Sequence, residues 1–178
     1  MEKTRLDVFL DQLKALAIAE EPVDQVHSLL QQLLSNNLAV AKEIFKPLDD
    51  DVTLYEDETL CVLHYRMPPG VVVPPHDHRI PAIIGVYEGV EENHFFEVIN
   101  GRLVRQEIKQ VTTGNVLSIS PESIHSVQTG NDQPSAAIHV YLGELTKTQR
   151  FRYDWKTGLA IPLGNFDDIR EEPLGDKQ

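Results

Sequence analysis

The chain has 178 residues, 41% of them hydrophobic and 25% charged, which is ordinary for a soluble globular protein and favours a single domain. The formal net charge of −12 at pH 7 excludes nucleic acid and anionic membrane surfaces as expected partners, because both attract Lys and Arg. No apolar run approaches the roughly 20 residues of a membrane span, Met1–Lys14 lacks a signal-peptide core, and the single Cys61 excludes an internal disulfide, so we expect a cytoplasmic protein.

The first part of the chain, residues 1–46, is predicted to form a layer of helices. Apolar side chains recur at helical spacing over residues 3–19. Pro22 suits the first turn of a second helix. The pair Asn36–Asn37 is expected to end this helix and to cap a short third helix that runs through Phe45.

The pattern changes to short β-rich runs over residues 50–145. The runs lie at 53–56, 60–67, 71–73, 83–87, 94–99, 102–109, 116–119, 126–129 and 136–142. Asn100-Gly101 between two of them is a strong hairpin signal. Many short strands at this spacing predict an all-β barrel or sandwich. Residues 146–178 are expected to add one edge strand, within 149–155, and an acidic tail that runs over the surface after Phe166.

Two histidines two residues apart follow the apolar run at 71–73. Residues i and i+2 of a strand point to the same face, so His76 and His78 can direct two imidazoles at one metal ion. His125, which follows Pro121 in a later strand-like run, is the candidate third ligand. Neutral imidazole binds iron, zinc, nickel and copper alike, so these residues alone do not name the metal.

The spacing around these histidines resembles that of the cupins, which are small double-stranded β-helix (jelly-roll) barrels. The first cupin motif places a glycine, a His-x-His pair, a glutamate and a second glycine at fixed intervals, and it is matched here by Gly70, His76, His78 and Gly89. Ala82 takes the place of the glutamate, so we expect no carboxylate among the metal ligands. The second motif is followed loosely, by Gly114, Pro121 and His125.

Among cupins, the three-histidine set and the later run at 137–141 resemble the cysteine dioxygenase group, the thiol dioxygenases. The resemblance implies one iron(II) ion, with zinc or nickel also fitting the ligands, and a small thiol and dioxygen as substrates of a reaction that forms a sulfinate. In that group a Ser-x-His-x-Tyr run forms a relay beside the iron. His139 and Tyr141 match it as candidate catalytic residues, whereas Ala137 replaces the serine.

The same group holds the substrate carboxylate with an arginine upstream of the first motif. This chain has no arginine between Phe45 and Thr59, and the nearest candidates for substrate binding are Arg66 and Arg79. A bidentate arginine–carboxylate pair adds both energy and geometry. We therefore expect free cysteine to be a poor substrate.

Several alternatives stay open. The chain could instead be a zinc- or nickel-bound cupin that isomerises, hydrates or hydrolyses its substrate, or a non-catalytic cupin that senses or stores a small ligand. His139 and Tyr141 could serve only to satisfy hydrogen bonds of the barrel, and Arg66 and Arg79 could be surface charges. Since dimers are common in the superfamily, a homodimer is the expected assembly by analogy.

Overall fold

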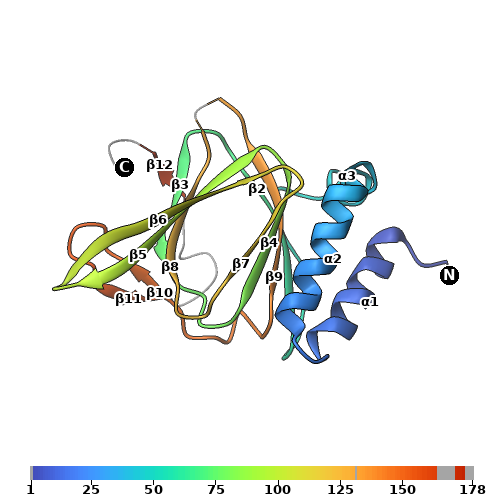
Figure 1. Ribbon diagram of the computed structural model, residues 1–178, viewed down its shortest axis with the longest axis horizontal. Helices are drawn as coiled ribbons and strands as arrows, with labels where there is room; N and C mark the ends of the chain where they lie inside the picture. The colour runs from blue at the N-terminus through green and yellow to red at the C-terminus, as the bar shows by residue number, and fades with distance from the viewer. Residues whose placement is uncertain (1, 131, 164–170, 175–178) are drawn as a thin grey trace.

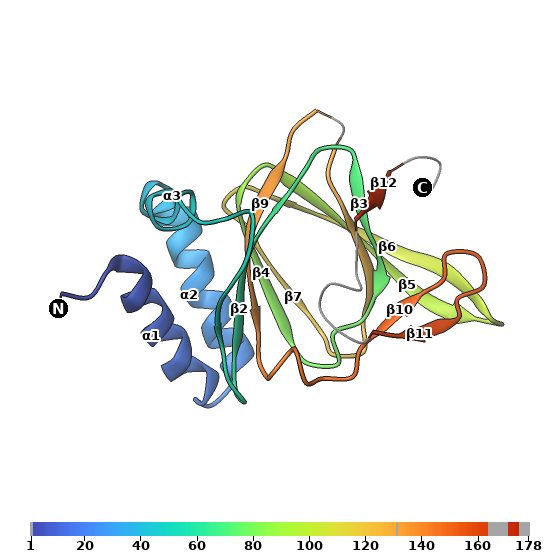
Figure 2. The same ribbon diagram turned by 180° about the vertical axis from the view of Figure 1, so that it is seen from behind.

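Three helices pack against one sheet of a β-barrel in the computed structural model, which describes residues 2–130, 132–163 and 171–174 (Figures 1 and 2). They are α1 (Arg5–Ala17), α2 (Pro22–Asn36) and α3 (Leu38–Phe45), which confirms the three helices predicted for this part of the chain. Thr4 caps α1, because its hydroxyl accepts from the Asp7 amide at 3.1 Å while the Asp7 carboxylate accepts from the Thr4 amide at 2.9 Å. None of the helices in the described ranges is long and apolar enough to cross a bilayer.

The barrel consists of two sheets whose described strands all pair antiparallel. The sheet under the helices has the order β1 (Asp51–Glu56), β2 (Cys61–Met67), β9 (Ser135–Tyr141), β4 (Ala82–Glu88) and β7 (Val116–Ile119). The other sheet has the order β11 (Ala160–Pro162), β10 (Phe151–Tyr153), β3 (Val71–His76), β8 (Ile124–Gln128), β5 (Val90–Ile99) and β6 (Arg102–Thr112), with β12 (Glu172–Pro173) also paired to β3. The protein is thus mainly β, a barrel of two antiparallel sheets with an N-terminal helical layer.

Strand β9 separates two apolar cores by the alternation of its side chains. Ile138 and Val140 belong to the core between the sheet and the helices, whereas Ala137 and Tyr141 belong to the core inside the barrel. A glycine in the neighbouring strand lets α2 approach this sheet closely, because a Cβ atom at Gly85 would lie only 2.7 Å from a methyl group of Leu34. The helices therefore close one outer face and leave the interior to the residues that point away from them.

The C-terminal part of the chain differs from the prediction. The strand expected within 149–155 is β10, but it lies between β3 and β11 and is therefore not an edge strand. Residues 164–170 and 175–178 of the predicted tail lie outside the described residues. The part between them forms β12 and ends in the buried Leu174, since β3 still offers backbone groups for pairing there.

Candidate metal centre

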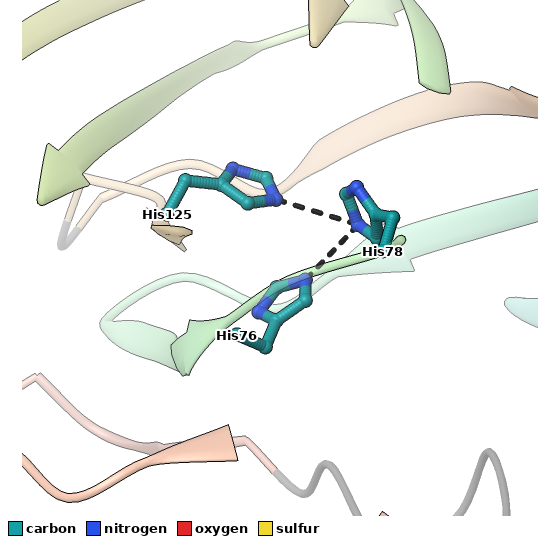
Figure 3. A group of neighbouring side chains, drawn as sticks. All are labelled: His76, His78 and His125. Carbon is teal, nitrogen blue, oxygen red and sulfur yellow. Dashed lines mark hydrogen bonds between the residues drawn. The ribbon is translucent and has the colours of Figure 1, made fainter. Parts of the chain in front are cut away.

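Three buried histidines, from two neighbouring strands and the loop after one of them, converge inside the barrel (Figure 3). His76 ends β3, and its backbone pairs with that of His125 on β8. His78 lies two residues later, in a loop, yet its ring still faces the other two. Its Nε2 atom lies 3.2 Å from Nε2 of His76 and 3.4 Å from Nε2 of His125. The structure therefore brings all three predicted ligands together.

In two of the rings, a hydrogen bond at Nδ1 leaves the lone pair of Nε2 directed at the centre of the cluster. His76 donates from Nδ1 to the carbonyl oxygen of Pro74 at 2.8 Å, and His125 donates from Nδ1 to the side-chain oxygen of Asn93 at 3.0 Å. In a neutral imidazole the other nitrogen is then an acceptor. Burial lowers the pKa of His76 to about 4 and those of His78 and His125 well below the usual range, so all three rings are neutral.

The spacing of these nitrogens fits a divalent metal ion. Metal–nitrogen bonds of about 2.1 Å at tetrahedral or octahedral angles place neighbouring nitrogens roughly 3.0 to 3.4 Å apart. Within the described ranges, these histidines form the one group of three or more His, Cys, Asp or Glu side chains whose ligand atoms all lie within 4.8 Å of one another. Glu88 is instead paired with Lys46, and Glu92 accepts hydrogen bonds from Gln128 and Gln110. The donor set that the structure shows is three neutral imidazoles without a carboxylate.

A cavity of about 500 Å³ lies next to the histidines, between the two sheets. Apolar side chains of both sheets form much of its wall, among them Leu63, Ile84 and Val127. An apolar wall lowers the local dielectric constant and so strengthens electrostatic interactions beside it. The polar groups that line it therefore have large effects on what can bind there.

His139 and Tyr141 face this cavity from β9. The Tyr141 ring lies edge-on to that of His78, with ring centroids 5.1 Å apart, and its hydroxyl is 3.3 Å from Nδ1 of His139. Burial lowers the pKa of His139 to about 3 and raises the pKa of Tyr141, so both groups are neutral. Nε2 of His139 is buried and has no hydrogen-bond partner among the residues that the structure describes. Tyr141 thus lies against one of the three candidate ligands, and Ala137 on the same face adds no hydrogen bond.

The two arginines proposed for substrate binding lie outside the cavity wall. Arg66 shares a face of β2 with His64, and the ring of His64 is hydrogen-bonded to the Tyr87 hydroxyl beneath the helices. The guanidinium of Arg66 forms an ion pair with Asp50 at 3.0 Å. This face of β2 therefore points toward the helices and not into the barrel, so Arg66 does not reach the cavity. Arg79 lies in the loop after the ligand pair, where its Nε atom is 2.6 Å from a carboxylate oxygen of Asp77.

Asp77 has a structural environment. It is buried and accepts hydrogen bonds from the Phe151 amide at 2.8 Å and the Tyr153 hydroxyl at 2.9 Å, in addition to its ion pair with Arg79. These contacts tie the loop that carries His78 to strand β10. Asp77 therefore fixes the loop that carries His78 against strand β10.

Three polar residues near the site were not predicted from the sequence. Arg150 is 4% exposed and lines the cavity, Glu91 lines it from β5, and Asn93 holds His125. Glu91 and Asn93 lie in β5 but before residue 94, where the predicted strand begins. Arg150 has no comparable local signal, because its position depends on the pairing of β10 with β3.

Asn93 provides a test of the ligand geometry. Asn93→Ala removes the acceptor that fixes the ring of His125, and such outer partners typically contribute about 10–100-fold in metal affinity. We expect a loss of that size in competition titrations with a chelator. Asn115→Ala, in an exposed turn where the amide bonds only Thr112, is the control and should leave the affinity unchanged. Equal affinity in both variants would show that Asn93 does not position His125.

No protein-family model matches this chain. Solved structures with a similar fold include DMSP lyase DddQ from Ruegeria pomeroyi DSS-3 (21% identity, TM-score 0.43, 53% of this chain and 43% of that chain). Another is an uncharacterized conserved protein with a double-stranded β-helix domain from Klebsiella pneumoniae (15% identity, TM-score 0.47, 58% of this chain and 79% of that chain). A third is oxalate decarboxylase from Bacillus subtilis (20% identity, TM-score 0.46, 57% of this chain and 26% of that chain). The chain spans less than half the length of the DMSP lyase. The residues that line the cavity are therefore the evidence for what this barrel does.

Proposed function

We propose that this protein is a mononuclear iron(II) dioxygenase that oxidises a small thiol to a sulfinate. The observation that carries the proposal is a set of three neutral imidazoles, with no carboxylate, facing a largely apolar cavity beside the His139–Tyr141 pair. An iron(II) ion on these ligands would supply the redox chemistry that joins dioxygen to sulfur. The overall reaction, RSH + O2 → RSO2H, places both oxygen atoms on the sulfur and needs no other reductant.

The donor set favours an anionic sulfur ligand. Three neutral ligands leave a divalent ion with its full charge and with open positions, which attract an anion such as a thiolate. Arg150 adds a second positive charge in the cavity wall, close enough to His76 to contribute to the lowering of its pKa. The protein thus presents its positive charge at the end of the cavity where the sulfur would bind.

Tyr141 is the polar group best placed to act on the reacting atoms. Its ring lies against His78, and its hydroxyl stays protonated because burial raises its pKa, so it can donate a hydrogen bond beside the metal ligands. His139 contacts that hydroxyl through Nδ1 and orients it. We assign hydrogen-bond donation to Tyr141 and its positioning to His139.

Arg150 also changes the expectation for free cysteine. That expectation rested on the lack of an arginine at the site, and the structure places Arg150 in the cavity wall. A carboxylate on the substrate would therefore have a partner near the metal end. Cysteine belongs among the thiols to be tested as a substrate.

The test is oxygen uptake by protein that has been loaded with iron(II) under anaerobic conditions. We expect thiol-dependent uptake with about one dioxygen consumed per sulfinate formed, and none from the zinc-loaded protein, since zinc has no redox chemistry. A panel of cysteine, cysteamine, 2-mercaptoethanol and 3-mercaptopropionate covers the charge types. No uptake with any of them by fully iron-loaded protein would overturn the proposal.

A further inference from the structure

A buried carboxyl group that the proposed reaction does not use faces the same cavity. Glu91 on β5 is fully buried, and its Oε1 atom accepts a hydrogen bond from the Ser135 hydroxyl at 3.0 Å. Its Oε2 atom is buried and has no partner among the residues that the structure describes. Burial raises the pKa of Glu91 to about 7. A buried carboxylate with one free oxygen is costly unless a donor or a cation satisfies it.

Glu91 lies at the end of the cavity away from the three histidines. It shares the inward face of β5 with Asn93, which holds His125, and two residues of a strand span roughly 6–7 Å. On the facing sheet, its partner Ser135 precedes His139 by four residues of β9. The cavity therefore has a metal end, at the three histidines, and a carboxyl end, at Glu91 and Ser135.

The charges that face the cavity favour a cation at the carboxyl end. Three acidic side chains line it, those of Asp51, Glu91 and Glu171, against the single guanidinium of Arg150 among the described residues. Glu171 accepts a hydrogen bond from the Tyr65 hydroxyl, which leaves Glu91 as the fully buried acid of the three. An anionic group would be repelled there, and a neutral one would leave the carboxylate without a counter-charge.

We propose that Glu91 binds an amine group of the substrate, so that the cavity selects an aminothiol whose sulfur faces the histidines and whose ammonium faces the carboxyl end. The sulfur end of this inference rests on the proposed function, whereas the amine end rests on Glu91 alone. Ser135 holds one carboxylate oxygen and thereby directs the other into the cavity. Glu91 is then a specificity residue that acts on substrate binding.

The experiment measures ligand binding without turnover. Protein carrying cobalt(II) in place of iron is titrated anaerobically with two matched pairs, cysteamine against 2-mercaptoethanol and 3-aminopropane-1-thiol against 3-mercaptopropan-1-ol. Binding is followed by the thiolate-to-cobalt charge-transfer band. Since hydrogen bonds to charged groups are the stronger class, we expect the wild-type protein to prefer an amine over its matched alcohol by about tenfold or more. The pair with the larger preference reports the reach from metal to carboxylate.

Glu91→Gln should remove this preference while it changes binding of the alcohols by less than about twofold, since only the charge is lost. Glu91→Met, which fills similar volume without a polar atom, is the second variant and should give the same result if the glutamine variant folds poorly. Glu92→Gln is the matched control, because that carboxylate bonds Gln110 and Gln128 away from the cavity. It should keep the full preference for amines.

The outcomes separate this inference from the proposed function. Equal binding of amine and alcohol by the wild-type protein, or a preference that survives in both Glu91 variants, would overturn the role of Glu91. The lack of any thiolate band in the wild-type protein would overturn the inference as stated, because the sulfur must face the metal. A preference for amines that depends on Glu91, together with no oxygen uptake by the iron-loaded protein, would support the amine site and overturn the dioxygenase.

Discussion

His125→Ala should abolish tight metal binding and, with it, all turnover. Only three side chains in the described ranges converge on the centre, and no carboxylate stands ready to replace a lost imidazole. The loss should therefore exceed the roughly 10–100-fold expected for an outer partner such as Asn93. Elemental analysis after dialysis should give a nearly stoichiometric metal content for the wild-type protein and almost none for the variant.

A second histidine on the same sheet provides the matched control. His94 is also buried, but its ring lies 3.4 Å from the Glu92 carboxylate and outside the three-histidine cluster. His94→Ala should keep its metal. Because a bound ion stabilises the folded state, chelation should lower the melting temperature of the wild-type protein and of His94→Ala but not that of His125→Ala. A His125→Ala variant with full metal content would show that the ligand set is wrong.

The fold could largely be predicted from the sequence because it depends on local patterns. Helical periodicity located α1, α2 and α3, and short β-rich runs between turn residues located the strands of the barrel. The position of β10 between β3 and β11 could not be predicted. It depends on backbone pairing between segments some 75 residues apart along the chain, and no local pattern encodes such pairing.

Some residues of the candidate site could likewise be predicted from the sequence, and others could not. His139 and Tyr141 are two residues apart in one predicted strand, so they share a face, and this face does line the cavity. Alternation cannot say which face of β2 the helices cover, so the sequence could not show that Arg66 points away from the cavity. Arg150 and Glu91 reach the cavity only once the second sheet is assembled. Residues within one motif were therefore predictable, whereas those that give the cavity its charge were not.

Tyr141→Phe should lower turnover by about 10–100-fold while the protein keeps its metal, the size of effect typical of groups just outside the ligands. The change removes one hydroxyl and little volume. That hydroxyl makes a long contact, 3.3 Å, with His139, so its loss should destabilise the fold by no more than about 1 kcal/mol. Steady-state oxygen uptake, metal analysis and thermal melts on the same preparation separate these effects.

Tyr87→Phe gives the opposite pattern and is the control for a purely structural hydroxyl. Tyr87 lies beneath the helices, where its hydroxyl is 2.6 Å from Nε2 of the buried His64, so its removal leaves a buried ring nitrogen without its partner, at a cost of roughly 1–3 kcal/mol. We expect that variant to melt earlier and to keep its turnover. If Tyr141→Phe behaved in the same way, or kept full activity, Tyr141 and His139 would have only structural roles, and the three histidines alone would remain as the functional core of the site.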